Sequence, residues 1–183
     1  MAKLSAKAFW LLPKTQRKIL VAKDILKWIE KGVIKPSEGR YFAPTRTRGL
    51  DMSSEVRGNL SSLPPCEVCE LGAAALCIGN LGNKMTFEDV GGVGNWDYDN
   101  LSKSQKLLFK VFTKKEVALM EACIENGYAF VAEHTKTYQL SYEEKEVSKA
   151  FYSLFTKSKD RMIAISKNII RNKGKFIPEK DIK

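Results

Sequence analysis

The fold is decided by Leu63-Pro-Pro-Cys-Glu-Val-Cys-Glu-Leu-Gly-Ala-Ala-Ala-Leu-Cys77, a stretch that holds three of the four cysteines. Proline suits the first turn of a helix, where an amide has no intrahelical partner, so Pro64-Pro65 predicts a helix from about residue 65 to residue 78. Glycine inside a helix costs about 1 kcal/mol relative to alanine, which indicates a packing reason for Gly72. The expected buried stripe comprises Cys69, Gly72, Ala73, Leu76 and Cys77, because cysteine behaves as a small hydrophobe.

Two chemical alternatives compete with this packing interpretation. A zinc site needs four ligands around one metal, and only Cys66, Cys69, Cys123 and His134 are available for it. On the predicted helix Cys77 lies roughly 12 Å along the axis from Cys69, which removes it from any shared site. A thiol-dependent site would use Cys66 in the first helical turn, where the helix dipole favours thiolate. We expect no strand to lead into the motif, and the neighbouring glutamates disfavour thiolate, so a redox role is not favoured. The sequence has no second Cys-x-x-Cys, so we also expect no metal site.

Composition indicates one soluble globular domain spanning residues 1–183. The hydrophobic fraction is 44% and the charged fraction 28%, which are ordinary values for a globular chain. The apolar run Ala8–Leu12 is too short for a membrane span or a signal peptide. We therefore expect a cytoplasmic protein without a membrane partner, in which the cysteines stay reduced.

The net charge of +10 is concentrated at the two ends of the chain. Residues 1–48 carry twelve Lys/Arg against three Asp/Glu, and residues 157–183 carry nine against three. The intervening residues carry ten against fifteen and are net acidic. If the two ends meet in space, they form a basic face that attracts nucleic acid, a nucleotide or an acidic protein. Solvated lysines on amphipathic helices are the alternative interpretation.

Hydrophobic periodicity and capping signals predict a mainly α fold with at most a small β-hairpin around residues 128–140. Apolar residues recur at helical spacing over residues 15–31, and Gly32 is placed to end that helix. Helices are also expected over about 102–111, 114–126, 142–156 and 158–173. The spacing of a capping box, Ser/Thr followed three residues later by Glu or Gln, marks three of these starts. These pairs are Ser102/Gln105, Thr113/Glu116 and Ser141/Glu144.

Residues 35–62 are expected to form an irregular, Arg-rich loop, and residues 175–183 a flexible basic tail. Loops rich in Arg, Gly and Pro are common places for ligand contacts, and aromatic rings next to arginines are typical of interaction hot spots. The candidate binding residues are Arg40, Tyr41, Arg46, Arg48, Arg57, Trp96, Tyr98, Arg171 and Lys173.

No coherent catalytic set emerges from the sequence. His134 is the single histidine, and one histidine does not supply both the acid and the base of a typical hydrolytic reaction. The loop Gly91–Asn95 lacks the third glycine of a dinucleotide-binding fingerprint. We expect no cofactor, and an enzymatic activity has no support from the residues.

Two segments together resemble small uncharacterised proteins of bacteriophages and bacterial mobile elements. They are Cys66-Glu-Val-Cys-Glu-Leu-Gly-Ala73 and Asn168-Ile-Ile-Arg-Asn-Lys-Gly-Lys-Phe-Ile-Pro178. The resemblance implies an accessory protein acting in the cytoplasm of a bacterial host cell. The leading hypothesis is a non-enzymatic protein that binds and inhibits or redirects a bacterial host or defence protein through its basic surface. Binding of nucleic acid or a signalling nucleotide is the first alternative, and a zinc- or thiol-dependent protein using Cys66 and Cys69 is the second.

Overall fold

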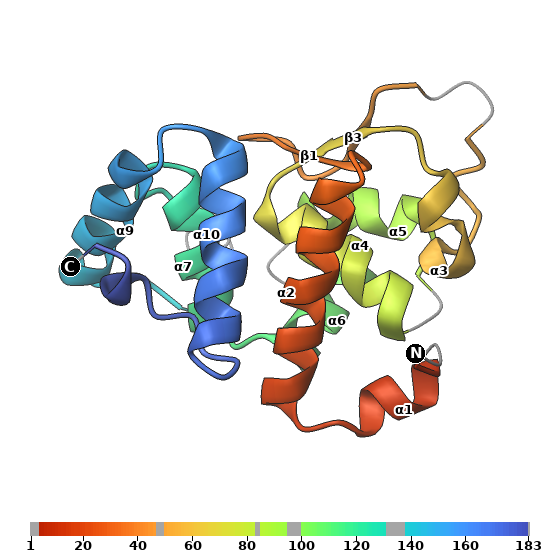
Figure 1. Cartoon of the computed structure of the whole chain (residues 1–183), viewed down its shortest axis with the longest axis horizontal. Helices are drawn as coiled ribbons and strands as arrows, with labels where there is room; N and C mark the ends of the chain where they lie inside the picture. Colours follow the sequence, from red (N-terminus) through yellow and green to blue (C-terminus); the bar gives the residue numbers. More distant parts are fainter. Residues whose placement is uncertain (1–3, 47–49, 83–84, 95–99, 131–137, 183) are drawn as a thin grey trace.

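The computed structural model describes residues 4–46, 50–82, 85–94, 100–130 and 138–182, and its architecture is mainly α, as predicted (Figure 1). The α-helices are α1 (Ala6–Leu11), α2 (Lys14–Glu30), α3 (Val56–Asn59), α4 (Glu70–Gly82), α5 (Phe87–Gly91), α6 (Lys103–Val111), α7 (Lys114–Ile124), α9 (Tyr142–Leu154) and α10 (Ser158–Arg171). Three short strands, β1 (Ile34–Pro36), β2 (Ala43–Pro44) and β3 (Cys66–Val68), form a small sheet.

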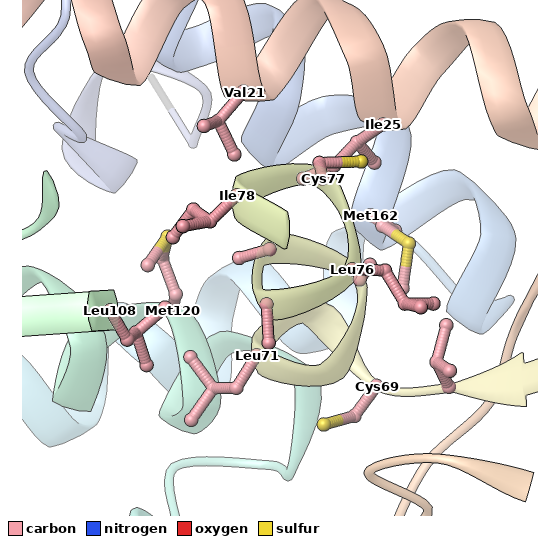
Figure 2. Close-up of a cluster of buried hydrophobic side chains, with 14 of the residues drawn as sticks. Val21, Ile25, Cys69, Leu71, Leu76, Cys77, Ile78, Leu108, Met120 and Met162 are labelled. Carbon is pink, nitrogen blue, oxygen red and sulfur yellow. The ribbon is translucent and has the colours of Figure 1, made fainter. Parts of the chain in front are cut away.

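Helix α4 occupies the centre of the molecule, which confirms the packing interpretation of the cysteine-rich stretch. Every residue from Val68 to Gly79 is buried. Figure 2 shows Leu76 next to Met162 of α10, Cys77 next to Ile25 of α2, and Leu71 next to Leu108 and Met120. Because helices surround α4, the stripe predicted for one face extends around the whole helix.

The predicted helix start at residue 65 is wrong, because Cys66–Val68 form a strand. β3 lies in the middle of the sheet, parallel to β1 and antiparallel to β2. The Cys66 N–H donates to the Val33 carbonyl at 2.8 Å. The strand begins at the first cysteine of the Cys-x-x-Cys motif and so forms part of the motif instead of leading into it. Pairing with residues distant in sequence outweighs the local helix signal of the two prolines.

Local capping signals fix the helix starts that the sequence predicted. Complete capping boxes begin α6, α7 and α9 at Ser102, Thr113 and Ser141. A fourth, from Thr86 to Asp89, begins α5. Each box satisfies two backbone amides that lack intrahelical partners, which explains why short helices form at these positions. Gly32, with φ +71°, adopts the left-handed conformation expected after α2.

Helices α2 and α10 lie side by side, although the two termini of the chain are on opposite sides of the molecule (Figure 1). They have the most extensive contact between any two elements of the described chain, and they run antiparallel, side by side (Figure 1). The turn after α10 touches the start of α2: a Cβ added at Gly174 would lie 2.5 Å from the Thr15 carbonyl oxygen. One helix from each basic segment therefore lies beside the other, while the rest of the two segments lies apart.

Buried ion pairs connect the helical ends to the rest of the fold. Lys18 of α2 donates to both carboxylate oxygens of Glu116, at 2.5 and 2.6 Å, and Glu116 also completes the capping box of α7. Arg161 of α10 is fully buried and pairs with Glu38, in the loop after β1. Its Nη1 donates to the Phe155 carbonyl at 2.6 Å, and its guanidinium lies 4.0 Å from the centre of the Tyr152 ring.

The remaining expectations for irregular segments differ from the structure in part. Residues 35–62 contain β2, α3 and most of β1. Residues 175–182 pack against the body of the protein, since Phe176 and Pro178 are buried and the Ile177 N–H donates to the Asn168 side chain at 2.9 Å. A flexible tail is thus wrong for these residues. The expected hairpin at 128–140 falls mostly on residues 131–137, which lie outside the described residues.

Candidate functional site

The arginines of the 35–62 segment have different environments. Arg40 pairs with Glu67 of β3 at 2.9 Å, and Arg57 donates to the carbonyls of Leu81 and Leu4 at 2.6 and 2.9 Å. Both side chains therefore hold this segment to the protein itself. Arg46 is exposed and lines a cavity. The candidates Arg48, Trp96 and Tyr98 lie outside the described residues.

The cavity beside Arg46 has a volume of about 420 Å³ and a mixed lining. Leu50, Pro64 and Phe87 supply apolar walls, and Asp51 lies on the same rim as Arg46. Hydrogen bonds from Ser53 and Ser54 lower the pKa of Asp51, so this carboxylate is ionised at neutral pH. A guanidinium and a carboxylate on one rim give the cavity no net preference for anions.

Tyr41 fixes the segment between β1 and β2 against α7. Its hydroxyl donates to Glu121 at 2.5 Å, and the Gly39 N–H donates to Glu125, one turn later, at 2.7 Å. These groups border a cavity of about 230 Å³ that also contains Cys69 in its lining. Tyr41 therefore acts as a positioning residue in the described structure.

The cysteine thiols are packing groups. Burial raises the pKa of Cys66 and of Cys69 to about 12, and burial also raises the pKa of Cys77 and Cys123. A thiol with such a pKa is protonated at neutral pH and reacts slowly. Cys66 is in β3 rather than in a first helical turn, so the helix dipole of α4 does not act on it as expected. Within the described ranges no three His, Cys, Asp or Glu side chains form a metal-binding cluster, and His134 lies outside those ranges.

Glu70 is an ionisable group that the sequence analysis did not single out as a site. It is the first residue of α4 and is 1% exposed, and its Oε2 has no hydrogen-bond partner in the described structure. Burial raises the pKa of Glu70 to about 8, although a helix N-terminus by itself would favour the charged form. The folded protein therefore holds a proton on Glu70 at neutral pH.

This proton makes folding stability depend on pH. A carboxyl whose pKa is raised on folding contributes most below its unfolded value of 4.5, and the contribution is lost as pH rises to about 8. We expect Glu70→Gln to be within about 1 kcal/mol of wild type at pH 5 and up to about 4 kcal/mol more stable at pH 9. Urea unfolding between pH 5 and pH 9 measures the free energy of unfolding of both proteins. Glu88→Gln, a change at an exposed residue, is the control. Parallel stability curves for wild type and Glu70→Gln would contradict the assignment.

The C-terminal candidates Arg171 and Lys173 lie beside the start of α2. Arg171 pairs with Asp181, whereas Lys173 is exposed in the turn after α10. Because α10 runs antiparallel to α2 with Gly174 against Thr15, and each residue advances about 1.5 Å, Lys167 lies near the level of Lys23.

We give the name α2–α10 surface to six exposed lysines that lie on α2, in the second half of α10, or shortly after either helix. Its members are Lys23, Lys27, Lys31, Lys167, Lys173 and Lys175. Lys27 lies 3.7 Å from Asp24 and over the Trp28 ring, and Lys31 lies over the same ring. For Lys23, Lys167 and Lys175 the described chain provides no ion pair. These three lysines present charge to solvent and are available to a partner.

Several residues that hold this region together were not identified from the sequence. Arg161 had a detectable signal, because it is four residues before Ile165 and so falls on the buried side of α10. Lys18 had the same signal, because it is four residues before the buried Ala22 of α2. Glu38 had none, since it lies in a loop and its partner Arg161 is distant in the chain. Comparisons with protein-family models, curated proteins and solved structures found no match for this chain. No helix in the described ranges is long and apolar enough to cross a membrane.

Proposed function

We propose that the chain is a non-enzymatic binding protein that attaches to an anionic partner through the α2–α10 surface. The observation that carries the proposal is the apposition of one helix from each basic segment, in which α2 and α10 pack antiparallel. Five of the six lysines of this surface, all except Lys27, have no ion pair in the described chain, so no existing ion pair has to break when they bind an anion. In the setting that the phage resemblance implies, the partner is a bacterial host or defence protein in the cytoplasm.

The buried thiols support a role without chemistry at the cysteines. A raised thiol pKa disfavours nucleophilic attack and metal binding, both of which need the thiolate. The arginines Arg40 and Arg57 are engaged within the protein, so the lysines of the α2–α10 surface are better candidates for partner contacts than the predicted arginine loop. We therefore assign the proposed interface to the α2–α10 surface and not to the 35–62 segment.

A pair of charge-reversal variants tests the location of the surface. The first carries Lys23→Glu, Lys167→Glu and Lys175→Glu, all on the α2–α10 surface. The matched control carries Lys7→Glu, Lys106→Glu and Lys145→Glu, exposed residues of α1, α6 and α9. Both have the same net charge, and retention on immobilised heparin is the measurement.

We expect the α2–α10 variant to elute at a clearly lower salt concentration than the control variant, because clustered cations bind a polyanion together. Equal elution of the two variants would show that retention reflects net charge alone and would contradict the proposed surface. Circular dichroism of both variants establishes that they are folded.

A further inference from the structure

An apolar groove opens beside the α2–α10 surface, where the end of α9 meets α10. Its volume is about 380 Å³. Leu154, Phe155, Ile163 and Ala164 form its apolar part, and Asp160 and Lys167 lie at its edge. Leu154 is 52% exposed, which is high for a leucine beside a groove with other apolar side chains.

The lining of this groove contains one lysine and one aspartate, and two lysines next to it add positive charge. Lys167 lines it, and Lys157 and Lys159 are exposed next to it at the start of α10. Asp160 is the single acid among the described residues that line it. A ligand in the groove therefore meets apolar side chains together with lysines in and next to the lining.

The groove has a rigid frame. The carbonyl of Phe155 accepts a hydrogen bond from buried Arg161, which also binds Glu38 and Ser158. The Phe155 ring packs on Phe151, with 4.9 Å between ring centroids. A preformed groove costs little conformational entropy on binding.

We propose that this groove receives an amphipathic helix of the partner protein, with apolar anchors that enter the groove and Asp or Glu residues that contact the lysines. This inference rests on the proposed function and names the partner class. Grooves between two helices commonly take such helices, whose anchors recur at three- and four-residue spacing. A nucleic-acid backbone has no apolar group to place against Leu154 and Ile163, and a second copy of this chain would bring a net charge of +10 against the same lysines.

The test uses defined probes and measures their affinity by fluorescence anisotropy. The main probe is a fluorescein-labelled helical peptide of about sixteen residues with Leu at three- and four-residue spacing and Glu elsewhere. The second contains the same residues in an order that distributes Leu around the helix, and the third is a duplex DNA oligonucleotide. The double variant Leu154→Ser/Ile163→Ser is compared with Leu11→Ser, a change at an exposed leucine of α1.

We expect the amphipathic peptide to bind at least about tenfold more tightly than the shuffled peptide. The double variant should lose about tenfold in affinity for it, which corresponds to about 1.4 kcal/mol, and Leu11→Ser should lose nothing. Equal affinity for both peptides, unchanged affinity of the double variant, or tighter binding of DNA than of the amphipathic peptide would overturn the inference.

The heparin and peptide measurements distinguish failure of this inference from failure of the proposed function. Heparin retention that depends on Lys23, Lys167 and Lys175 does not require the groove, and the double variant should elute from heparin like wild type. If the two peptides bind with equal affinity while the charge-reversal variants still elute from heparin at different salt concentrations, only the groove inference is overturned. Equal elution of the two charge-reversal variants overturns the surface, and the groove inference falls with it.

Discussion

Gly72→Ala should destabilise the protein by at least about 3 kcal/mol or prevent it from folding. A Cβ added at Gly72 would lie 1.6 Å from the Tyr41 carbonyl oxygen and 2.7 Å from its carbonyl carbon. Both are backbone atoms, so a rotamer change does not relieve the clash. The backbone at this position is further held by the bond from the Cys69 N–H to the Arg40 carbonyl at 2.5 Å. Overpacking a closely packed core lowers stability by about 1–3 kcal/mol, and by more where the backbone must move.

Urea unfolding followed by circular dichroism measures this effect, with Gly91→Ala as the matched control. A Cβ at Gly91 meets only Phe42 Cδ1 at 3.9 Å, so that substitution should change stability by no more than about 1 kcal/mol. If Gly72→Ala unfolded cooperatively with a free energy of unfolding within about 1 kcal/mol of wild type, the result would contradict the central packing of α4.

Arg161→Ala is the second substitution with a large expected effect, a decrease of about 2–4 kcal/mol in the free energy of unfolding, because it truncates a fully buried side chain. The change removes a fully buried side chain together with its bonds to Glu38 and to the Phe155 carbonyl. It also leaves a cavity against the Tyr152 ring. Arg161→Lys keeps the charge but removes the planar guanidinium and its multiple N–H donors, so we expect an intermediate loss of stability.

The control is Lys159→Ala, an exposed position of the same helix, where the change should stay within about 0.5 kcal/mol. Urea unfolding compares the three variants with wild type. If Arg161→Ala were no more destabilising than Lys159→Ala, the buried guanidinium would not hold the α9–α10 junction, and the rigid frame of the groove would lose its support.

Signals confined to a few neighbouring residues were readable from the sequence. The capping boxes at Ser102, Thr113 and Ser141 depend on side chains three residues apart, and the small residues of α4 indicated burial directly. The mainly α class follows from these features. The strand β3 was not readable, because three residues with prolines before them become a strand only when β1 and β2 pair with them.

The sequence showed which segments carry the positive charge of the candidate surface, but it did not show how those segments are arranged in space. Charge counting located both basic ends, but the antiparallel packing of α2 and α10 depends on apolar contacts between residues more than a hundred positions apart. The arginines of the 35–62 segment looked like ligand contacts, and their proximity to Glu67 and to the Leu81 and Leu4 carbonyls gives two of them a structural role. The groove depends on the relation of α9 to α10, for which local sequence carries no signal.

The central claim is that a protein partner binds the α2–α10 surface, and affinity capture tests it most directly. Wild type and the two charge-reversal variants are immobilised and incubated with bacterial lysate, with and without nuclease treatment, and the bound proteins are identified by mass spectrometry. The account predicts that one set of proteins is recovered on wild type and on the Lys7/Lys106/Lys145 control and is lost from the Lys23/Lys167/Lys175 variant. Equal recovery on all three proteins, or recovery that disappears with nuclease treatment, would contradict it.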